Sequence, residues 1–142
     1  MGDRYLSKAK RVDNGKWVEG YLIVDEKDYS KYFIGFVLGT NEDGTPHDLD
    51  VVQVDPSTIC QCTGLKDKNG KLIFENDICD RKEEYPEIVK YNNGDWTLDY
   101  SYSKGKESGY CYCNLGFYAL ERKYVEVIGN IFDNPELLEV QP

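Results

Sequence analysis

The 142-residue sequence predicts a mainly β fold, and three observations lead to that class. Tyrosine and glycine are frequent, with 12 and 13 copies, which favours strands and tight turns over helices. Asn-Gly pairs at 14–15 and 93–94 are typical of β-hairpin turns. The stretch 96–103 alternates apolar and polar residues, which is the period of a strand buried on one side. The length suits one medium domain or two small units.

The N-terminal elements are placed by these turns and by apolar runs. The run Lys31–Leu38 is nearly all apolar, so it is expected as a buried strand. The residues 39–49 are polar and are expected as a loop. The other expected strands in this part of the chain are 6–12, 16–24, 51–54 and one that begins at 59–62.

The C-terminal elements are shorter. In the alternating stretch, Trp96, Leu98, Tyr100 and Tyr102 share the side expected to be buried. Gly129 is expected at a bulge or a close approach. Asn134 and Pro135 are typical of the first positions of a short helical turn. The remaining expected strands are 71–74, 78–81, 87–91, 110–113, 118–120 and 125–132.

The net charge is −9, from 17 basic and 26 acidic residues. A surplus of negative charge disfavours general nucleic-acid binding and binding to anionic membranes, because both need a basic face. Residues 1–16 are basic, whereas the acids concentrate in 41–55 and 75–87. These segments are either solvated loops or an acidic surface that engages a basic partner or mimics nucleic acid. The candidate interaction surface comprises Glu42, Asp43, Asp48, Asp50, Glu83, Glu84 and Glu87.

The five cysteines form two C-x-C pairs, 60/62 and 111/113, with Cys79 alone. On a strand this spacing puts both thiols of a pair on one face of the sheet. Cysteine is a common core residue, so we expect buried structural thiols. A zinc site and a redox role are the alternatives. His47 is the single histidine and is expected to be exposed. The sequence contains no phosphate-binding glycine loop. We therefore expect no catalytic residue, no metal and no cofactor.

The aromatic residues of 96–103 have a second interpretation, because such a stripe can stack nucleic-acid bases. Surfaces of that kind also need Lys and Arg beside the aromatic rings. The neighbours here are Asp95 and Asp99, so core packing is the better interpretation.

Three segments together resemble the YopX family of small phage and prophage proteins. They are DNGKWVEGY (13–21), QCTGLKDKNGKLIFENDI (61–78) and VIGNIFDNPELL (127–138). The sequence departs from the family pattern at Cys62, Asn76 and Cys79, where Tyr, Gly and Val are usual. Asn tolerates the positive φ that Gly would adopt.

The resemblance implies an N-terminal β region (1–62) and a C-terminal SH3-like barrel with a tail (63–142), packed as one compact unit. It supplies no activity, so we expect a non-enzymatic phage or prophage accessory protein in the cytoplasm of a bacterial host. Its expected partner is an unidentified host or phage protein. A small barrel that binds nucleic acid is the alternative, and self-association stays open because sheet edges can pair.

Overall fold

A computed structural model describes residues 2–104 and 112–139, and the chain is mainly β, as predicted. The chain divides into two compact units, residues 2–61 and the part that begins at Cys62. In the described part of the chain, no helix has the length and apolar character needed to cross a membrane.

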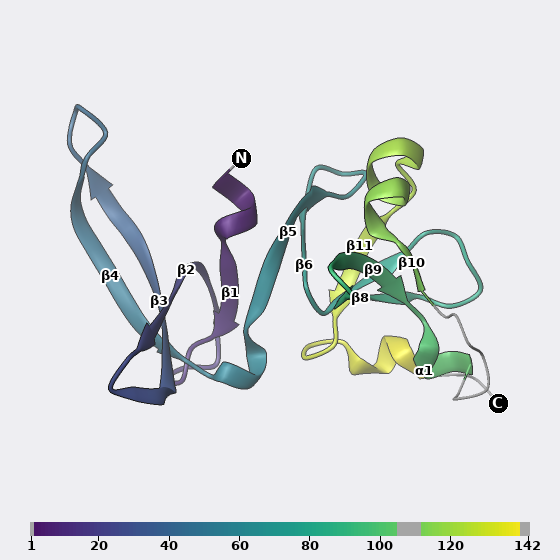
Figure 1. The fold of residues 1–142 in the computed structure, drawn as a ribbon, viewed down its shortest axis with the longest axis horizontal. Helices are drawn as coiled ribbons and strands as arrows, with labels where there is room; N and C mark the ends of the chain where they lie inside the picture. Colours follow the sequence, from purple (N-terminus) through teal and green to yellow (C-terminus); the bar gives the residue numbers. More distant parts are fainter. Residues whose placement is uncertain (1, 105–111, 140–142) are drawn as a thin grey trace. The chain divides into compact units, whose positions relative to one another are not determined.

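The N-terminal unit is an antiparallel sheet with the strand order β4-β3-β2-β1-β5 (Figure 1). A 3₁₀ turn at Gly2–Tyr5 precedes the sheet, and another at Pro56–Thr58 leads into its last strand. The strands are β1 (Ser7–Lys10), β2 (Trp17–Asp25), β3 (Asp28–Thr40), β4 (Pro46–Val54) and β5 (Cys60–Lys66). Only the first two residues of β5 belong to this unit, which ends at Gln61.

The hairpin expected at Asn14–Gly15 is confirmed, because β1 pairs with β2 in antiparallel register. Gly15 adopts a φ of +71°, and the Asn14 side chain accepts a hydrogen bond from the Lys16 N–H. Further along β2, a Cβ on Gly20 would lie 2.4 Å from the carbonyl oxygen of Gly35 on β3. Only glycine permits this approach of two backbones.

Strands β3 and β4 differ from the prediction. β3 begins at Asp28 and ends at Thr40, and β4 begins at Pro46, inside the expected polar loop. The expectation that 31–38 is a buried strand is wrong in part: Ile34 is fully buried, whereas Val37 on the opposite side and Leu38 near the end of the strand are exposed. The core of the unit is Ala9, Ile34 and Val54, with half-buried residues such as Val18 and Val52 around it.

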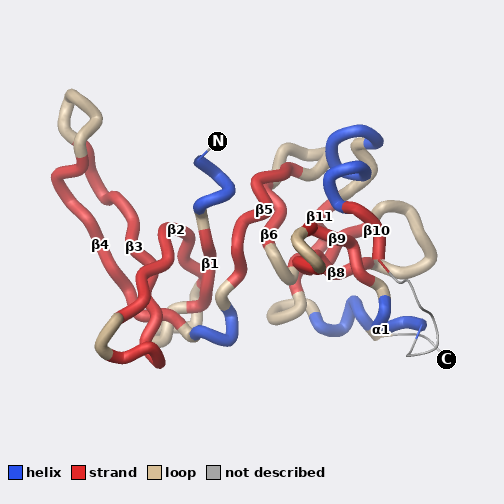
Figure 2. The backbone as a smooth tube through the Cα atoms, in the orientation of Figure 1, coloured by secondary structure: helices blue, strands red, loops and turns tan. Residues whose placement is uncertain are grey.

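The C-terminal unit is a second antiparallel sheet, with the order β10-β9-β8-β7-β11, and Figure 2 shows short helical segments beside its strands. Its strands are β6 (Leu72–Phe74), β7 (Asp77–Asp80), β8 (Glu87–Asn92), β9 (Asp95–Asp99), β10 (Tyr112–Asn114) and β11 (Glu126–Asn130). Its helical segments are α1 (Ser101–Lys104), a π-helix at Phe117–Arg122 and a 3₁₀ turn at Pro135–Leu138.

The five strands that a small barrel needs are therefore present, but the barrel does not close. In the described residues, β10 pairs only with β9 and β11 only with β7. The sheet is open, so the SH3-like barrel that the resemblance implied is not shown, whereas the mainly β class is. β6 pairs with β5 at Cys62 and Lys66 and stands outside this sheet.

Two other local predictions are corrected. The alternating strand ends at Asp99 rather than Ser103, because the Asp99 side chain accepts a hydrogen bond from the Ser101 N–H and α1 begins there. The stretch expected as a strand at 118–120 lies in the π-helix. Of the expected strand 110–113, residues 110 and 111 lie outside the described residues.

Asp67 joins the loop before β6 to strand β11. Its Oδ1 accepts from the N–H groups of Asn69 and Lys71, both at 2.9 Å, and its Oδ2 accepts from the Val127 N–H at 3.0 Å. Burial would raise the pKa of Asp67, but these backbone donors lower it below its ordinary value. β11 then bulges between Val127 and Gly129, as expected of that glycine.

The core of this unit is formed by Ile73, Cys79, Val89, Leu98, Leu115, Ala119 and Val125. Cys60, Cys62 and Cys79 are buried, in agreement with cysteine as a core residue, and Cys113 is half-buried. Cys111 lies outside the described residues. Burial raises the pKa of the Cys79 thiol well above its ordinary value, with the charge of Asp77 as a further cause.

Candidate functional site

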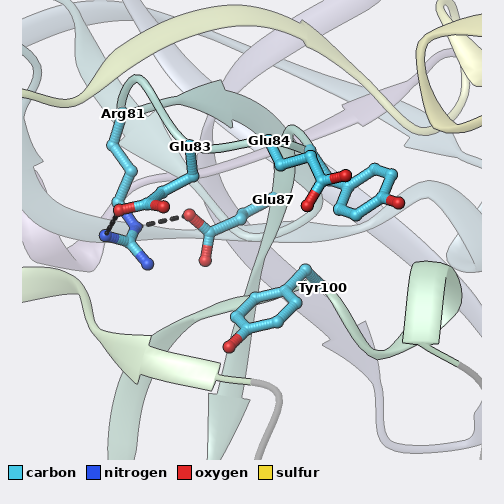
Figure 3. Close-up of a pocket in the computed structure, with 6 residues that line it drawn as sticks. Arg81, Glu83, Glu84, Glu87 and Tyr100 are labelled. Carbon is cyan, nitrogen blue, oxygen red and sulfur yellow. Dashed lines mark hydrogen bonds and ion pairs between the residues drawn. The ribbon is translucent and has the colours of Figure 1, made fainter.

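The β7–β8 connection of the C-terminal unit forms a pocket of about 140 Å³, here called the acidic pocket (Figure 3). The chain bends sharply after β7: Lys82 adopts a φ of +68°, and its N–H donates to Asp80 Oδ1 at 2.9 Å. The residues that line the pocket are Arg81, Glu83, Glu84, Tyr85, Glu87 and Tyr100.

Arg81 holds the pocket together because each of its three guanidinium nitrogens has a partner. Nε donates to Glu87 Oε1 at 2.5 Å, Nη1 to Glu83 Oε1 at 3.0 Å and Nη2 to Cys113 Sγ at 3.2 Å. The guanidinium carbon lies 4.3 Å from the ring centroid of Tyr118, a cation–π distance. The Arg81 side chain is 8% exposed, so it is a structural cation.

Glu87 is the unusual group of the pocket, because its side chain is only 1% exposed. In Figure 3 one carboxylate oxygen faces Arg81. The other, Oε2, is buried and accepts no hydrogen bond from the described residues. Burial raises the pKa of Glu87 to about 7, although the hydrogen bond and charge of Arg81 lower it in part. A buried acceptor without a donor favours any ligand that supplies one.

The other side of the pocket is formed by the residues that follow β9. Tyr100 lines the pocket, and the Tyr102 hydroxyl donates to the Pro86 carbonyl at 2.7 Å, which ties α1 to the start of β8. Burial raises the pKa of Tyr102, and the charges of Glu87 and Tyr85 raise it further. The rim is acidic, because Glu83 and Glu84 are exposed.

One thiol and three carboxyl groups lie in or beside the pocket. Burial raises the pKa of Cys113 above its ordinary value although Arg81 opposes this, so the thiol stays protonated at neutral pH and is a poor nucleophile. Three carboxyl groups and one arginine line the pocket, which leaves an excess of negative charge. A cavity of about 150 Å³ accepts a benzene-sized group, so an ammonium or guanidinium group fits in size.

The predicted interaction surface falls into two sets. Glu42, Asp43 and Asp48 are exposed, Asp50 is half-buried, and all four lie on β4 or the turn before it in the N-terminal unit. The pKa of Asp43 is lowered by hydrogen bonds from the Thr45 hydroxyl and N–H. In the C-terminal unit, Glu83, Glu84 and Glu87 line the same pocket, and Glu83 and Glu87 contact Arg81.

Sequence reasoning missed Arg81 and Tyr100 as members of the site, and it did not indicate that Glu87 is buried. The sequence did contain a signal for Arg81 and for the burial of Glu87. Arg81 is a basic residue within an acidic segment, and Glu87 directly precedes the apolar pair Ile88–Val89 at the start of a strand. A carboxylate in such a position needs a cationic partner.

The fold and the site together define a small β protein of two units with an arginine-centred acidic pocket. The family described as YopX protein matches residues 8–139, which is nearly the whole chain. The chain therefore belongs to the YopX family, as its three motifs indicated. No curated protein matches it in a sequence search.

Proposed function

We propose that this protein is a non-enzymatic phage or prophage accessory protein that binds a partner protein through a Lys or Arg side chain in the acidic pocket. The observation that carries the proposal is Glu87 Oε2, a buried oxygen that accepts no hydrogen bond from the described residues. A cationic side chain supplies both a donor and the opposite charge. The exposed Glu83 and Glu84 at the rim attract the same partner.

A pair of short peptides tests this proposal. One carries a central arginine in a background of Gly, Ser and Ala, and the other carries citrulline, which has the same shape without the charge. We expect the arginine peptide alone to shift the backbone NMR signals of residues 81–87, and added salt to weaken its binding. Equal binding of the two peptides would contradict the proposal.

Matched variants locate the contact. At pH 8, above the pKa of Glu87, Glu84→Gln and Glu87→Gln each remove a charge from the acidic pocket, and we expect each to weaken arginine-peptide binding at least fivefold. Glu42→Gln removes an exposed charge from the other part of the predicted surface and serves as the control. If Glu42→Gln weakens binding and Glu84→Gln does not, the contact lies on the N-terminal unit instead.

Nucleic-acid binding is the second candidate, and one cluster favours it. On the outer side of β1, Lys8 and Lys10 place their ammonium groups 4.9 and 5.4 Å from the Trp17 ring centroid. Basic residues beside an aromatic ring suit single-stranded nucleic acid. Glu19 lies opposite Lys8 in the register, and its negative charge opposes nucleic-acid binding at this cluster. Labelled single-stranded DNA and RNA at low salt test this candidate, and absence of binding there removes it.

A further inference from the structure

One side of the β2–β3–β4 sheet in the N-terminal unit is apolar and uncovered. The cross-strand register places Tyr21 beside Gly35 and Val51, and Val37 beside Leu49. The large side chains on this side, here called the open face, are Tyr21, Ile23, Val37, Leu49 and Val51, exposed by 51, 43, 49, 62 and 52%. They surround a shallow apolar groove at Gly35.

The opposite side of the same strands already contributes the core residues Ile34 and Val54. Antiparallel sheets with one side in water alternate apolar and polar residues, whereas strands covered on both sides are apolar throughout. β2 and β3 follow the second pattern, with the runs YLIV and YFIGFVL. The open face therefore has the composition of a surface that another surface covers.

The charge pattern indicates what kind of surface covers it. Between residues 21–23 of β2, 33–37 of β3 and 49–53 of β4, no alternate position on this side is Asp, Glu, Lys, Arg or His. The chain carries a net charge of −9, yet none of it falls here. Two copies can bring their open faces together without opposing like charges, and a basic partner finds no counter-charge on this face.

The apolar side chains of the face account for part of the area that an interface with a second copy needs. A fully exposed apolar side chain presents about 100 Å² of surface. The five side chains, each about half exposed, therefore present on the order of 250 Å². That is about a third of the roughly 800 Å² per partner in a standard interface. It suits the apolar centre of an interface whose rim is polar.

Edge pairing is the other way in which this sheet could meet a copy of itself, since β4 is an end strand of the sheet and only its last residues, near Val54, bridge to Arg11. In an antiparallel β4–β4 pair centred near Leu49, Asp48 and Asp50 of the two copies would face one another. Like charges directly opposite across strands are destabilising. Face-to-face packing avoids this repulsion.

We propose that the open face is the interface between two copies of this chain, which pack their β2–β3–β4 sheets face to face as a sandwich. Two such sheets lie about 10 Å apart, with their inner side chains interdigitated. The groove at Gly35 then receives a side chain of the other copy. This contact is independent of the acidic pocket, which belongs to the C-terminal unit.

Sedimentation of the full chain from 5 to 200 µM tests the proposal. We expect the wild type to form dimers, and Leu49→Lys to weaken association at least tenfold because it buries a charge in the interface. Leu49→Glu is expected to weaken it similarly, because an apolar contact between copies rejects either sign. Circular dichroism of each variant confirms that it folds, as expected for a side chain 62% exposed.

Val12→Lys is the matched control, because Val12 is 59% exposed and lies outside the open face. We expect this variant to associate like the wild type. Val37→Lys is a second probe of the face and is expected to behave like Leu49→Lys. A wild type that stays monomeric at 200 µM overturns the proposal. Unchanged association of the Leu49 and Val37 variants, or an effect of only one sign of charge at Leu49, also overturns it.

Discussion

Replacing Glu87 by Gln is predicted to make the C-terminal unit more stable at pH 8 and to leave it nearly unchanged at pH 4. Gln has the shape of a protonated glutamic acid and can still accept a hydrogen bond from Arg81 Nε. The substitution therefore mimics the neutral form of Glu87 at every pH. The change in the free energy of unfolding therefore measures what the negative charge of Glu87 costs the folded protein.

The magnitude follows from the pKa of Glu87, which burial raises from 4.5 to about 7. Between these two values the folded chain holds a proton that the unfolded chain has released. The free energy of unfolding therefore falls as pH rises through this window. At 1.36 kcal/mol per pKa unit, the total loss is about 3 kcal/mol. Glu87→Gln removes this dependence, so the variant gains about 3 kcal/mol over the wild type between pH 4 and pH 8.

The opposite outcome has a physical basis as well, which makes the experiment decisive. Removing one member of a buried ion pair usually destabilises a protein, because the other charge stays buried alone. Here Arg81 keeps Glu83 and the sulfur of Cys113 as partners. We therefore expect the cost of burying Glu87 as an anion to exceed the loss of its attraction to Arg81.

Urea unfolding at pH 4, 5, 6, 7 and 8 measures the effect. The chain has two tryptophans, Trp17 and Trp96, so a Trp17→Phe background makes the fluorescence specific for the C-terminal unit. Glu83→Gln is the control, since Glu83 also contacts Arg81 but is exposed. If Glu87→Gln is less stable than its parent at pH 8, the ion pair outweighs burial and the argument is refuted.

Three further substitutions test the packing. Gly20→Ala is expected to lower the free energy of unfolding of the N-terminal unit by about 1–3 kcal/mol, because its Cβ would lie 2.4 Å from the Gly35 oxygen; Trp17 fluorescence reports it. Asp67→Asn is expected to lower the free energy of unfolding by about 1–3 kcal/mol, because an amide cannot accept from all three N–H donors, including that of Val127. The variant is also expected to lose less stability in acid than the wild type, and an acid titration followed by circular dichroism checks this. Leu98→Ala is expected to cost about 2–5 kcal/mol, measured by Trp96 fluorescence, because Leu98 is fully buried.

Turns were the most predictable part of the fold. Asn93 and Gly94 both adopt positive φ between β8 and β9, and Asn76 does so before β7, as their residue types indicated. These conformations depend on local sterics, which the sequence carries directly. Strand ends were less predictable: the alternation of 96–103 continues past Asp99, where a local side-chain hydrogen bond starts a helical turn.

Burial was harder to predict than strand formation, because it depends on residues distant in the sequence. The apolar run at 31–38 indicated a strand, but no local rule says whether each side of that strand is covered. In the site, the acids Glu83 and Glu84 were identified by charge alone. The burial of Glu87 depends on Arg81, Tyr100 and the bend at Lys82, which come together only in the folded chain.

The two proposed contacts respond to salt in opposite ways, which separates them in one titration. The acidic pocket attracts a cation through charges at its exposed rim, and salt screens that attraction over about 10 Å at 0.1 M. The open face has no charge to screen, and sulfate strengthens apolar association. Between 50 and 500 mM sodium sulfate, arginine-peptide binding is therefore expected to weaken while dimerisation stays constant or strengthens. If dimerisation weakens in parallel with peptide binding, the copies meet through charged groups, and the assignment of the open face is wrong.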